Sequence, residues 1–216
     1  MIHDRDLQKS VLAELSWDPS VTAAHIGVTA DQGVVSLSGH VESYGEKHAA
    51  EAATRRVKGV KAVVEELEVR LKSDCLLNDD DIAREAIGRL AWHVVDPEYK
   101  VAIKVEKGWM TLSGQVEWHF QKEATESEIR RLPGVVGLDN QITIKPRVIV
   151  SNVSDDITHA LHRSWFFDPK TIDVSAEAGT IRLNGTVRSS HERKLAAQTA
   201  WAAPGVTMVE NNLSIV

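Results

Sequence analysis

Residues 33–41 read Gly-Val-Val-Ser-Leu-Ser-Gly-His-Val, and the same spelling, Gly-x-apolar-x-Leu-x-Gly-x-Val, returns at residues 108–116 and 179–187. The second glycine of this pattern advances by 75 positions and then by 71 (Gly39, Gly114 and Gly185). A Gly-Val pair recurs at the same spacing, at Gly59-Val60, Gly134-Val135 and Gly205-Val206. Motifs that stay in register over three copies indicate a tandem repeat with a period of about seventy residues.

The repeated spelling is typical of a β-hairpin whose second strand is half buried. The first glycine of each copy supplies the positive φ of a tight turn (Gly33, Gly108 and Gly179). The third, fifth and ninth residues of the pattern point to one face of the strand and are apolar in every copy. We therefore expect Leu37, Leu112 and Leu183 to be buried at equivalent places, because a slip of one residue would turn every side chain to the other face.

A helix is expected on each side of this hairpin. The first has apolar stripes at helical spacing: Leu7, Val11 and Leu15; Ile82, Ala86, Ile87 and Leu90; and Ile157, Ala160, Leu161 and Trp165. An Asp-Pro pair should end it, since the residue before proline leaves the α region (Asp18-Pro19, Asp96-Pro97 and Asp168-Pro169). A second, alanine-rich helix follows the hairpin, and a last strand follows the Gly-Val pair. The fold class is therefore α+β, with helix-strand-strand-helix-strand modules whose two helices cover one face of a three-stranded sheet.

Polar linkers separate the copies at residues 72–81 and 145–155. We expect three domains, at residues 1–73, 74–147 and 148–216. A module of this size can hold a modest core without disulfides or metals.

The strand pattern, the alanine-rich second helix and the Gly-Val pair together resemble the BON domain, named after bacterial OsmY and nodulation proteins. The resemblance covers essentially the whole chain, in three tandem copies. It implies a mixed three-stranded sheet with two helices packed on it. It also implies stress-linked, non-enzymatic roles, osmotic stress among them, in which association with phospholipid or membranes is the usual proposal. Some members occur beside a peptidoglycan-binding domain in potassium-sensing proteins, and most well-known members are exported.

Composition and charge narrow the classes of function. Hydrophobic residues make up 43% of the chain and charged residues 26%, as in ordinary globular proteins. The net charge of −6, without a basic arm, argues against a nucleic-acid partner. The single cysteine, Cys75, excludes an intramolecular disulfide. The acidic start of the chain does not read as a signal peptide and predicts a cytoplasmic protein, with a periplasmic location as the alternative if a signal has been removed.

Sites of chemistry are not evident in the sequence. The histidines, including His159 and His162, lack the spacing and cysteine neighbours of metal ligands. The glycines of each hairpin bracket a strand and do not open a helix, so they form no phosphate loop. The run Asp79–Asp81 lacks the spaced ligands of a calcium loop, and a capping or linker role is favoured. We expect no catalytic residues, no metal and no cofactor.

Six tryptophans fall into two groups. Three recur at the end of the first helix, which favours packing in the core or between copies (Trp17, Trp92 and Trp165). The other three, Trp109, Trp118 and Trp201, break the repeat. Trp201 stands where the other copies have Arg55 and Arg130, so its indole is expected to miss its own core and to lie at the surface or against another copy.

Two arginine pairs, Arg55-Arg56 and Arg130-Arg131, lie near the ends of the second helices. They complement the helix dipole, and they could also meet anionic headgroups. With the three exceptional tryptophans they are the candidate contacts for a surface or lipid.

The leading hypothesis is a stress-associated binding protein for phospholipid or membrane surfaces. The alternative is a structural adaptor made of three modules that binds a protein partner. A small-ion sensor, for potassium, is third.

Overall fold

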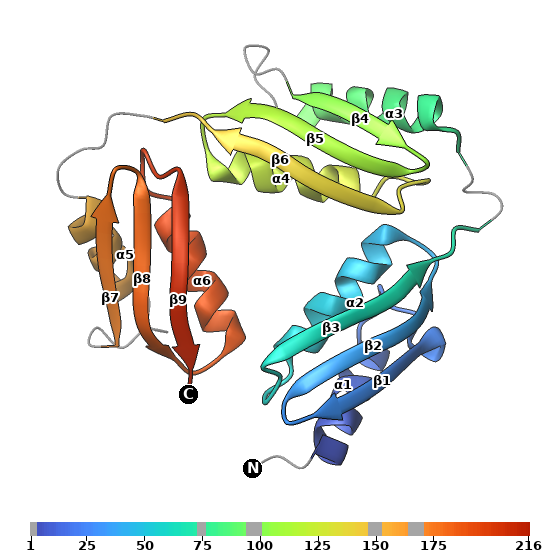
Figure 1. Ribbon diagram of the computed structural model, residues 1–216, viewed down its shortest axis with the longest axis horizontal. Coiled ribbons are helices and arrows are strands. Elements are labelled where there is room, and N and C mark those ends of the chain that lie inside the picture. Colours follow the sequence, from blue (N-terminus) through green and yellow to red (C-terminus); the bar gives the residue numbers. More distant parts are fainter. Residues whose placement is uncertain (1–3, 73–76, 94–100, 147–152, 164–170) are drawn as a thin grey trace. The chain divides into compact units, whose positions relative to one another are not determined.

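The computed structural model describes residues 4–72, 77–93, 101–146, 153–163 and 171–216 (Figure 1). The first repeat contains α1 (Asp4–Trp17), a 3-10 helix η1 (Ala23–His25), β1 (Ile26–Asp31), β2 (Val34–Val41), α2 (Tyr44–Arg56) and β3 (Ala62–Val69). The second contains α3 (Asp79–His93), β4 (Ala102–Glu106), β5 (Trp109–Val116), α4 (His119–Arg130) and β6 (Gly137–Ile144). The third contains α5 (Val153–Arg163), β7 (Ile172–Glu177), β8 (Thr180–Val187), α6 (Ser190–Trp201) and β9 (Met208–Ile215). The predicted module is confirmed.

Each repeat forms a three-stranded sheet with the second hairpin strand at its centre. In the first repeat β1 pairs antiparallel with β2, and β2 pairs parallel with β3. Leu37 on β2 lies opposite Val28 on β1 and Glu65 on β3. The third repeat has the same mixed pairing, with Leu183 in the place of Leu37. Because parallel strands need a crossover connection, the second helix of each repeat must run back along the sheet.

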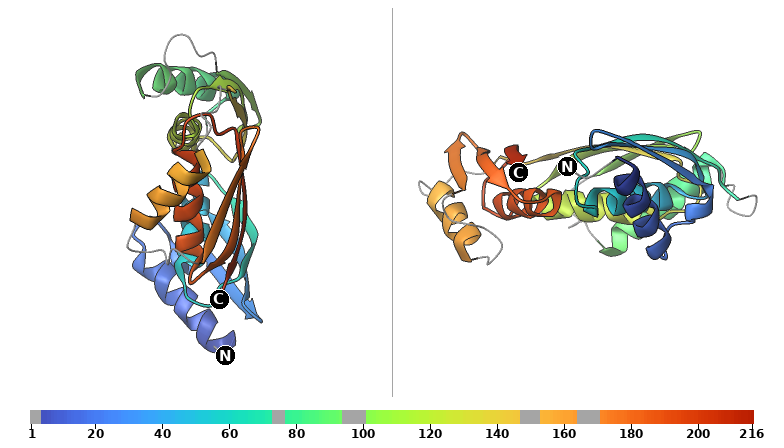
Figure 2. Two further views of the ribbon diagram at one scale, coloured as in Figure 1. Left: turned by 90° about the vertical axis from the view of Figure 1, so that its left-hand side faces the viewer. Right: turned by 90° about the horizontal axis from the view of Figure 1, so that it is seen from below.

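The core of each repeat lies between the sheet and its two helices, which cover one face of the sheet (Figure 2). Leu37, Leu112 and Leu183 each have an exposed fraction of 0%, which confirms the predicted strand register. In the first repeat the apolar stripe of α1 is buried in the same cluster as Leu37, as expected (Leu7, Val11 and Leu15).

Two hydrophobic residues of the first helices depart from the predictions. Trp17 is 84% exposed, so the prediction that it packs in the core or between copies is wrong. It lies two residues beyond the buried Leu15, a rotation of about 200° that turns it away from the sheet. Ile87 was expected on the inward stripe and is 60% exposed, because Ile82, Ala86 and Leu90 fill that stripe. The side chain of Trp92 and all of Trp165 lie outside the described residues.

The repeated glycines satisfy two backbone requirements. The hairpin turn places two successive residues at positive φ, Gln32 at 49° and Gly33 at 89°, as a type I′ turn demands. Gly39, inside β2, has a φ of 114°, and a Cβ there would lie 2.2 Å from the carbonyl oxygen of His25. Gly185 stands in the same relation to Thr171, at 2.0 Å. Only glycine allows this approach, which explains its place in the repeated spelling.

The acidic run Asp79–Asp81 forms the first turn of α3 and has a structural role. The side-chain oxygen of Asn78 accepts a hydrogen bond from the Asp81 backbone N–H at 2.8 Å, so Asn78 caps the helix. The Asp79 carboxylate accepts from the backbone N–H groups of Lys107 at 2.8 Å and Gly108 at 2.9 Å. The segment expected to be linker thus already contains the first turn of α3, and Asp79 holds the β4–β5 turn against it.

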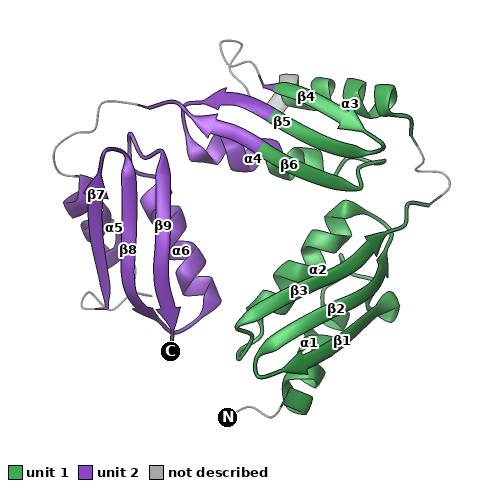
Figure 3. Cartoon of the chain, in the orientation of Figure 1, with its two compact units in different colours: residues 1–93, 102–112, 126–140 green, residues 94–101, 113–125, 141–216 purple. Residues whose placement is uncertain are grey.

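The chain divides into two compact units (Figure 3). One comprises residues 1–93, 102–112 and 126–140, and the other comprises residues 94–101, 113–125 and 141–216. Each unit contains one outer repeat and part of the middle repeat. Each unit therefore contains one junction between successive repeats.

An ion pair between Asp18 and Arg56 lies at the protein surface, directly after the end of α1. The Asp18 carboxylate accepts hydrogen bonds from the backbone N–H and the hydroxyl of Ser20, at 3.1 and 2.5 Å, and from Arg56 at 2.9 Å. These bonds, those from Ser20 first, lower the pKa of Asp18 from 3.8 to about 2. The folded state therefore favours the charged carboxylate, and this contribution is present above pH 3.8 and lost as the pH falls to about 2.

Replacing Asp18 with Asn should test this linkage. Asp18→Asn should unfold at lower urea than the wild type near neutral pH, because the charged acceptor is missing. The difference should shrink as the wild-type carboxyl is protonated between pH 3.8 and about 2. Urea midpoints measured across this range check the prediction, and a difference that stays constant would contradict it.

Truncation of Leu112 should destabilise the middle repeat. Leu112 is fully buried, and Leu112→Ala should lower the free energy of unfolding by about 2–5 kcal/mol. Leu12 is 36% exposed, and Leu12→Ala is the matched control with an expected loss below about 1 kcal/mol. Reversible chemical denaturation measures both, and equal losses would place Leu112 outside the core.

Candidate functional site

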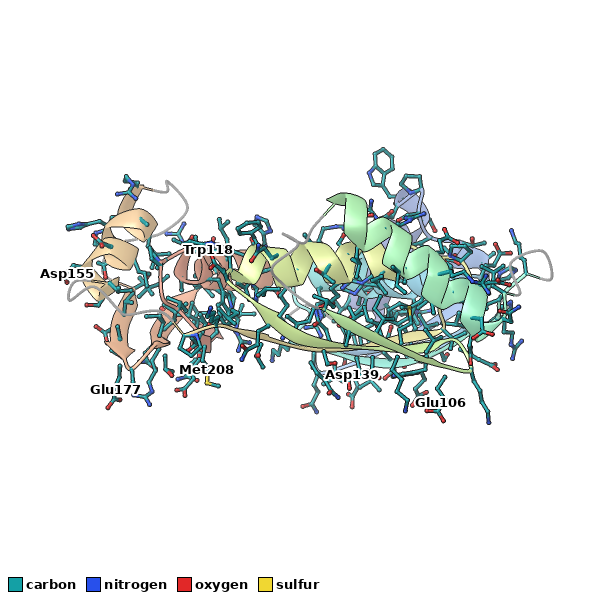
Figure 4. All side chains as sticks on the ribbon, turned by 90° about the horizontal axis from the view of Figure 1, so that it is seen from above. Glu106, Trp118, Asp139, Asp155, Glu177 and Met208 are labelled. Carbon is teal, nitrogen blue, oxygen red and sulfur yellow. The ribbon has the colours of Figure 1, made fainter. Side chains whose placement is uncertain are left out.

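Each compact unit holds a groove where the second helices of two successive repeats meet. The basic groove, of about 440 Å³, lies between the start of α2 and the end of α4. It is lined by Ser20, Ser43, Gly45, Glu46, His48, Ala49, Ser127, Arg130 and Arg131. The aromatic groove, of about 370 Å³, lies between the start of α4 and the end of α6. Trp118, one of the residues that line it, is labelled in Figure 4. It is lined by Trp118, His119, Phe120, Glu123, Gln198, Trp201 and Ala202.

The two grooves occupy equivalent positions of the repeat. On the helix-start side, residues of the basic groove recur 75 positions later in the aromatic groove: Ser43, Gly45 and His48 become Trp118, Phe120 and Glu123. On the helix-end side, the spacing is 71 positions: Ser127, Arg130 and Arg131 become Gln198, Trp201 and Ala202. One architectural site therefore occurs twice, once with cationic and once with aromatic walls.

The same pair of positions also makes the contact between repeats. His119, the first residue of α4, stacks on Trp201, the last residue of α6, with ring centroids 4.0 Å apart and planes 10° from parallel. The equivalent pair in the other unit is Tyr44 and Arg130. Burial raises the pKa of the Tyr44 phenol, which the charge of Arg130 and a hydrogen bond from the Leu138 backbone partly offset. Each junction thus joins the start of one second helix to the end of the next.

Trp201 differs in part from its prediction. The indole lies against the neighbouring repeat, as one of the expected alternatives had it, but it is also half-buried against the core of its own repeat. The expectation that it would miss this core is wrong. Its place at the end of α6 allows one face of the indole to meet Ala200 and its neighbours while the ring stacks on His119.

Trp118 stands at the position that caps the helix in the other repeats. The Ser43 and Ser189 hydroxyls each accept a hydrogen bond from a backbone N–H in the first turn, at 3.1 Å. Trp118 cannot do so, and the Gln121 side chain instead accepts from the backbone N–H of Trp118 at 3.0 Å. Loss of a serine cap typically costs about 1 kcal/mol, so helix stability does not explain the tryptophan.

The basic groove presents incompletely paired guanidinium groups. Arg130 pairs with Glu126, but its Nε is buried and has no hydrogen-bond partner among the described residues. Arg131 is exposed and forms no ion pair with a described residue. Glu46 is buried, and its two oxygens accept from the backbone N–H groups of Thr22 at 2.6 Å and Glu42 at 2.8 Å. The Glu46 carboxylate, which lines the groove, is thus already hydrogen-bonded to the protein backbone.

The remaining candidate residues lie in neither groove. Arg55 pairs with Glu51 at 2.7 Å, and Arg56 bridges Glu14 and Asp18, each at 2.9 Å. Trp109 is 53% exposed on the sheet face away from the helices. Its ring lies over Gly137 on β6, where an added Cβ would be 2.3 Å from ring carbons. The structure therefore unites Trp118 with Trp201, and Arg130 with Arg131, and leaves these three elsewhere.

Phe120, His119 and His48 line the grooves but were not among the candidate site residues expected from the sequence. Phe120 is 65% exposed at the mouth of the aromatic groove. It stands where the other repeats have Gly45 and His191, so the departure from the repeat that marked Trp118 would also have marked Phe120.

The described residues contain no group of three or more His, Cys, Asp or Glu side chains arranged to hold a metal ion. No helix in the described part of the chain has the length and apolar character needed to cross a bilayer.

Comparison with known proteins identifies relatives for all three repeats. The family model of the BON domain matches residues 3–70, 78–146 and 150–216. The osmotically-inducible protein Y of Escherichia coli strain K12 is 28% identical over 146 residues, which cover 66% of this chain and 73% of that protein.

Two solved structures align over most of the chain at low similarity. The C-terminal domain of CdsD, the structural protein of the Type III secretion system of Chlamydia trachomatis, is 19% identical with a TM-score of 0.27, and the alignment covers 100% of both chains. The PrgH periplasmic domain is 10% identical with a TM-score of 0.22, and the alignment covers 95% of this chain and 99% of that one. At these TM-scores neither likeness bears on function.

The capping position offers a direct test of why Trp118 is present. Trp118→Ser and Trp118→Ala both remove the indole, but only serine restores the cap found at Ser43 and Ser189. Trp118→Ser should therefore be more stable than Trp118→Ala by about 1 kcal/mol in chemical denaturation. Equal stabilities would show that Gln121 already satisfies the helix start.

Proposed function

Because the chain belongs to the BON domain family in all three of its repeats, we propose that it is a non-catalytic, stress-associated protein that binds anionic phospholipid surfaces. Members of this family are generally non-catalytic, and the relative from Escherichia coli is osmotically inducible by name. These relationships support a role in osmotic stress.

The observation that carries the proposal is the aromatic groove. Phe120 is 65% exposed, and the half-buried indoles of Trp118 and Trp201 lie beside it. An indole combines an apolar ring with a polar N–H, which suits the boundary between lipid chains and headgroups. Three aromatic side chains in one groove, one exposed and two half-buried, favour contact with an amphipathic partner over a solvated surface.

The basic groove supports the preference for an anionic surface. Arg130 and Arg131 line it, and basic residues near an anionic membrane contribute about 1 kcal/mol each. The chain as a whole carries a net charge of −6, so attraction must come from such local sites. Binding is therefore expected to weaken, without disappearing, between low and physiological salt.

A second candidate function is a structural adaptor that binds a protein partner. It is favoured by the stacking of His119 on Trp201, because an indole engaged between repeats fastens modules together. A stoichiometric protein partner in a pull-down, together with the absence of vesicle binding, would select this function.

Co-sedimentation with phosphatidylglycerol-containing vesicles tests the membrane proposal. Phe120→Ala should weaken binding at least about fivefold, since a lost aromatic contact is worth more than 1 kcal/mol. Trp17 is 84% exposed and lines neither groove, so Trp17→Ala is the matched control and should bind as the wild type does. Absence of wild-type binding at both low and physiological salt would refute the proposal.

Trp201→Arg separates the two candidate functions. The change restores the residue type of Arg55 and Arg130 and adds a positive charge. Weaker vesicle binding with unchanged unfolding would place Trp201 in a lipid contact, because the added charge alone should strengthen binding. Loss of stability with unchanged binding would instead make the indole a structural link.

A further inference from the structure

We propose that the basic groove is a binding site for a phosphate group. The proposal rests on the proposed function for the source of that group, a phospholipid headgroup, but the same chemistry is offered by free phosphate. The groove, of about 440 Å³, has room for a compact anion of this kind.

Arg130 supplies the first reason. Its side chain is 19% exposed, and its Nε is buried without a hydrogen-bond partner among the described residues. The exposed part of the side chain lines the groove, so an anionic oxygen there would meet the charge of a guanidinium that Glu126 only partly neutralises. The guanidinium also pairs with Glu126, so the group is held in place for an incoming ligand.

The start of α2 supplies the second reason. Ser43 and Gly45 line the groove at the first turn of this helix, where the helix dipole favours negative charge. The Ser43 hydroxyl accepts from the Glu46 backbone N–H at 3.1 Å, which leaves its own proton to donate to a ligand. Backbone and hydroxyl donors thus face the arginines across the groove.

Arg131 completes the set. It is exposed, lines the groove, and forms no ion pair with any residue in the described ranges. Its counterpart in the aromatic groove is Ala202, so the arginine is not needed to build the junction. A cation at the rim beside a buried guanidinium suits a tetrahedral anion with several acceptor oxygens.

Of the acidic groups at the site, Glu126 pairs with Arg130, and the Glu46 carboxylate bonds to none of the proposed donors. Both oxygens of Glu46 accept hydrogen bonds from backbone N–H groups, of Thr22 at 2.6 Å and of Glu42 at 2.8 Å. Glu46 therefore does not compete with a bound anion for the arginines. Glu126 accepts from Asn140 at 3.0 Å as well as from Arg130. His48 lies 3.8 Å from Glu51. The nearby carboxylates limit the net charge, which favours a phosphate over an extended polyanion.

Titration of the full chain with inorganic phosphate tests the site. Amide shifts in a nuclear magnetic resonance spectrum, at constant ionic strength with chloride as the reference anion, should saturate and should include Gly45 and Arg131. Arg131→Ala should weaken this binding about tenfold, the change expected for one lost charge-assisted contact. Arg55→Ala, at the counterpart of Arg130 in the first repeat, also removes one arginine charge but lies outside the groove, and it should leave binding unchanged.

A parallel arm uses phosphatidylglycerol vesicles with the same variants. Weaker vesicle binding by Arg131→Ala than by Arg55→Ala supports the site and identifies the headgroup as a source of the phosphate. Saturable phosphate binding at the groove without vesicle binding supports the site and overturns the membrane proposal. Equal effects of both variants on vesicles, with no phosphate shifts at the groove, overturn the site and leave the membrane proposal standing.

Discussion

The parallel pairing of the central strand with the last strand governs the whole structure. Two neighbouring parallel strands cannot be joined by a tight turn, so the chain must cross the sheet and return. In the first repeat α2 makes this crossing, capped by Ser43 at its start and followed by Gly59 at a φ of 100° before β3. The direction and the two ends of the second helix are thereby fixed in each repeat. Those ends are the parts from which both grooves are built.

The two grooves occupy the same position in the repeat but have different lining residues, so the same fold can present either cationic or aromatic side chains to a ligand. At each junction the first residue of one second helix interacts with the last residue of the next: the charge of Arg130 acts on the Tyr44 phenol, and His119 stacks on Trp201. The neighbouring positions tolerate serine or tryptophan, and arginine or alanine. The fold therefore determines where on the module a ligand can bind, and the residue differences between repeats determine which kind of ligand each groove suits.

The sequence predicted the fold well because its periodicities are local. The alternation around Leu37 and the stripe of Leu7, Val11 and Leu15 each specify a buried face without long-range information. Trp17 shows the limit of repetition as a guide, since a residue that recurs in every copy can still face solvent. Trp118 and Trp201 were found through their departure from the repeat. Their meeting could not be predicted, because it depends on how successive modules join.

The junctions between repeats are heterologous, because the start of one second helix always contacts the end of another second helix. The geometry of a heterologous contact does not limit the number of modules that can be added, and in other proteins such contacts produce open-ended fibres. The start of α6 and the end of α2 belong to neither junction. An added chain using the same contact would set Lys194, the counterpart of His48 and Glu123, beside Arg55 and Arg56. Placing like charges next to each other disfavours this contact between two copies of the chain.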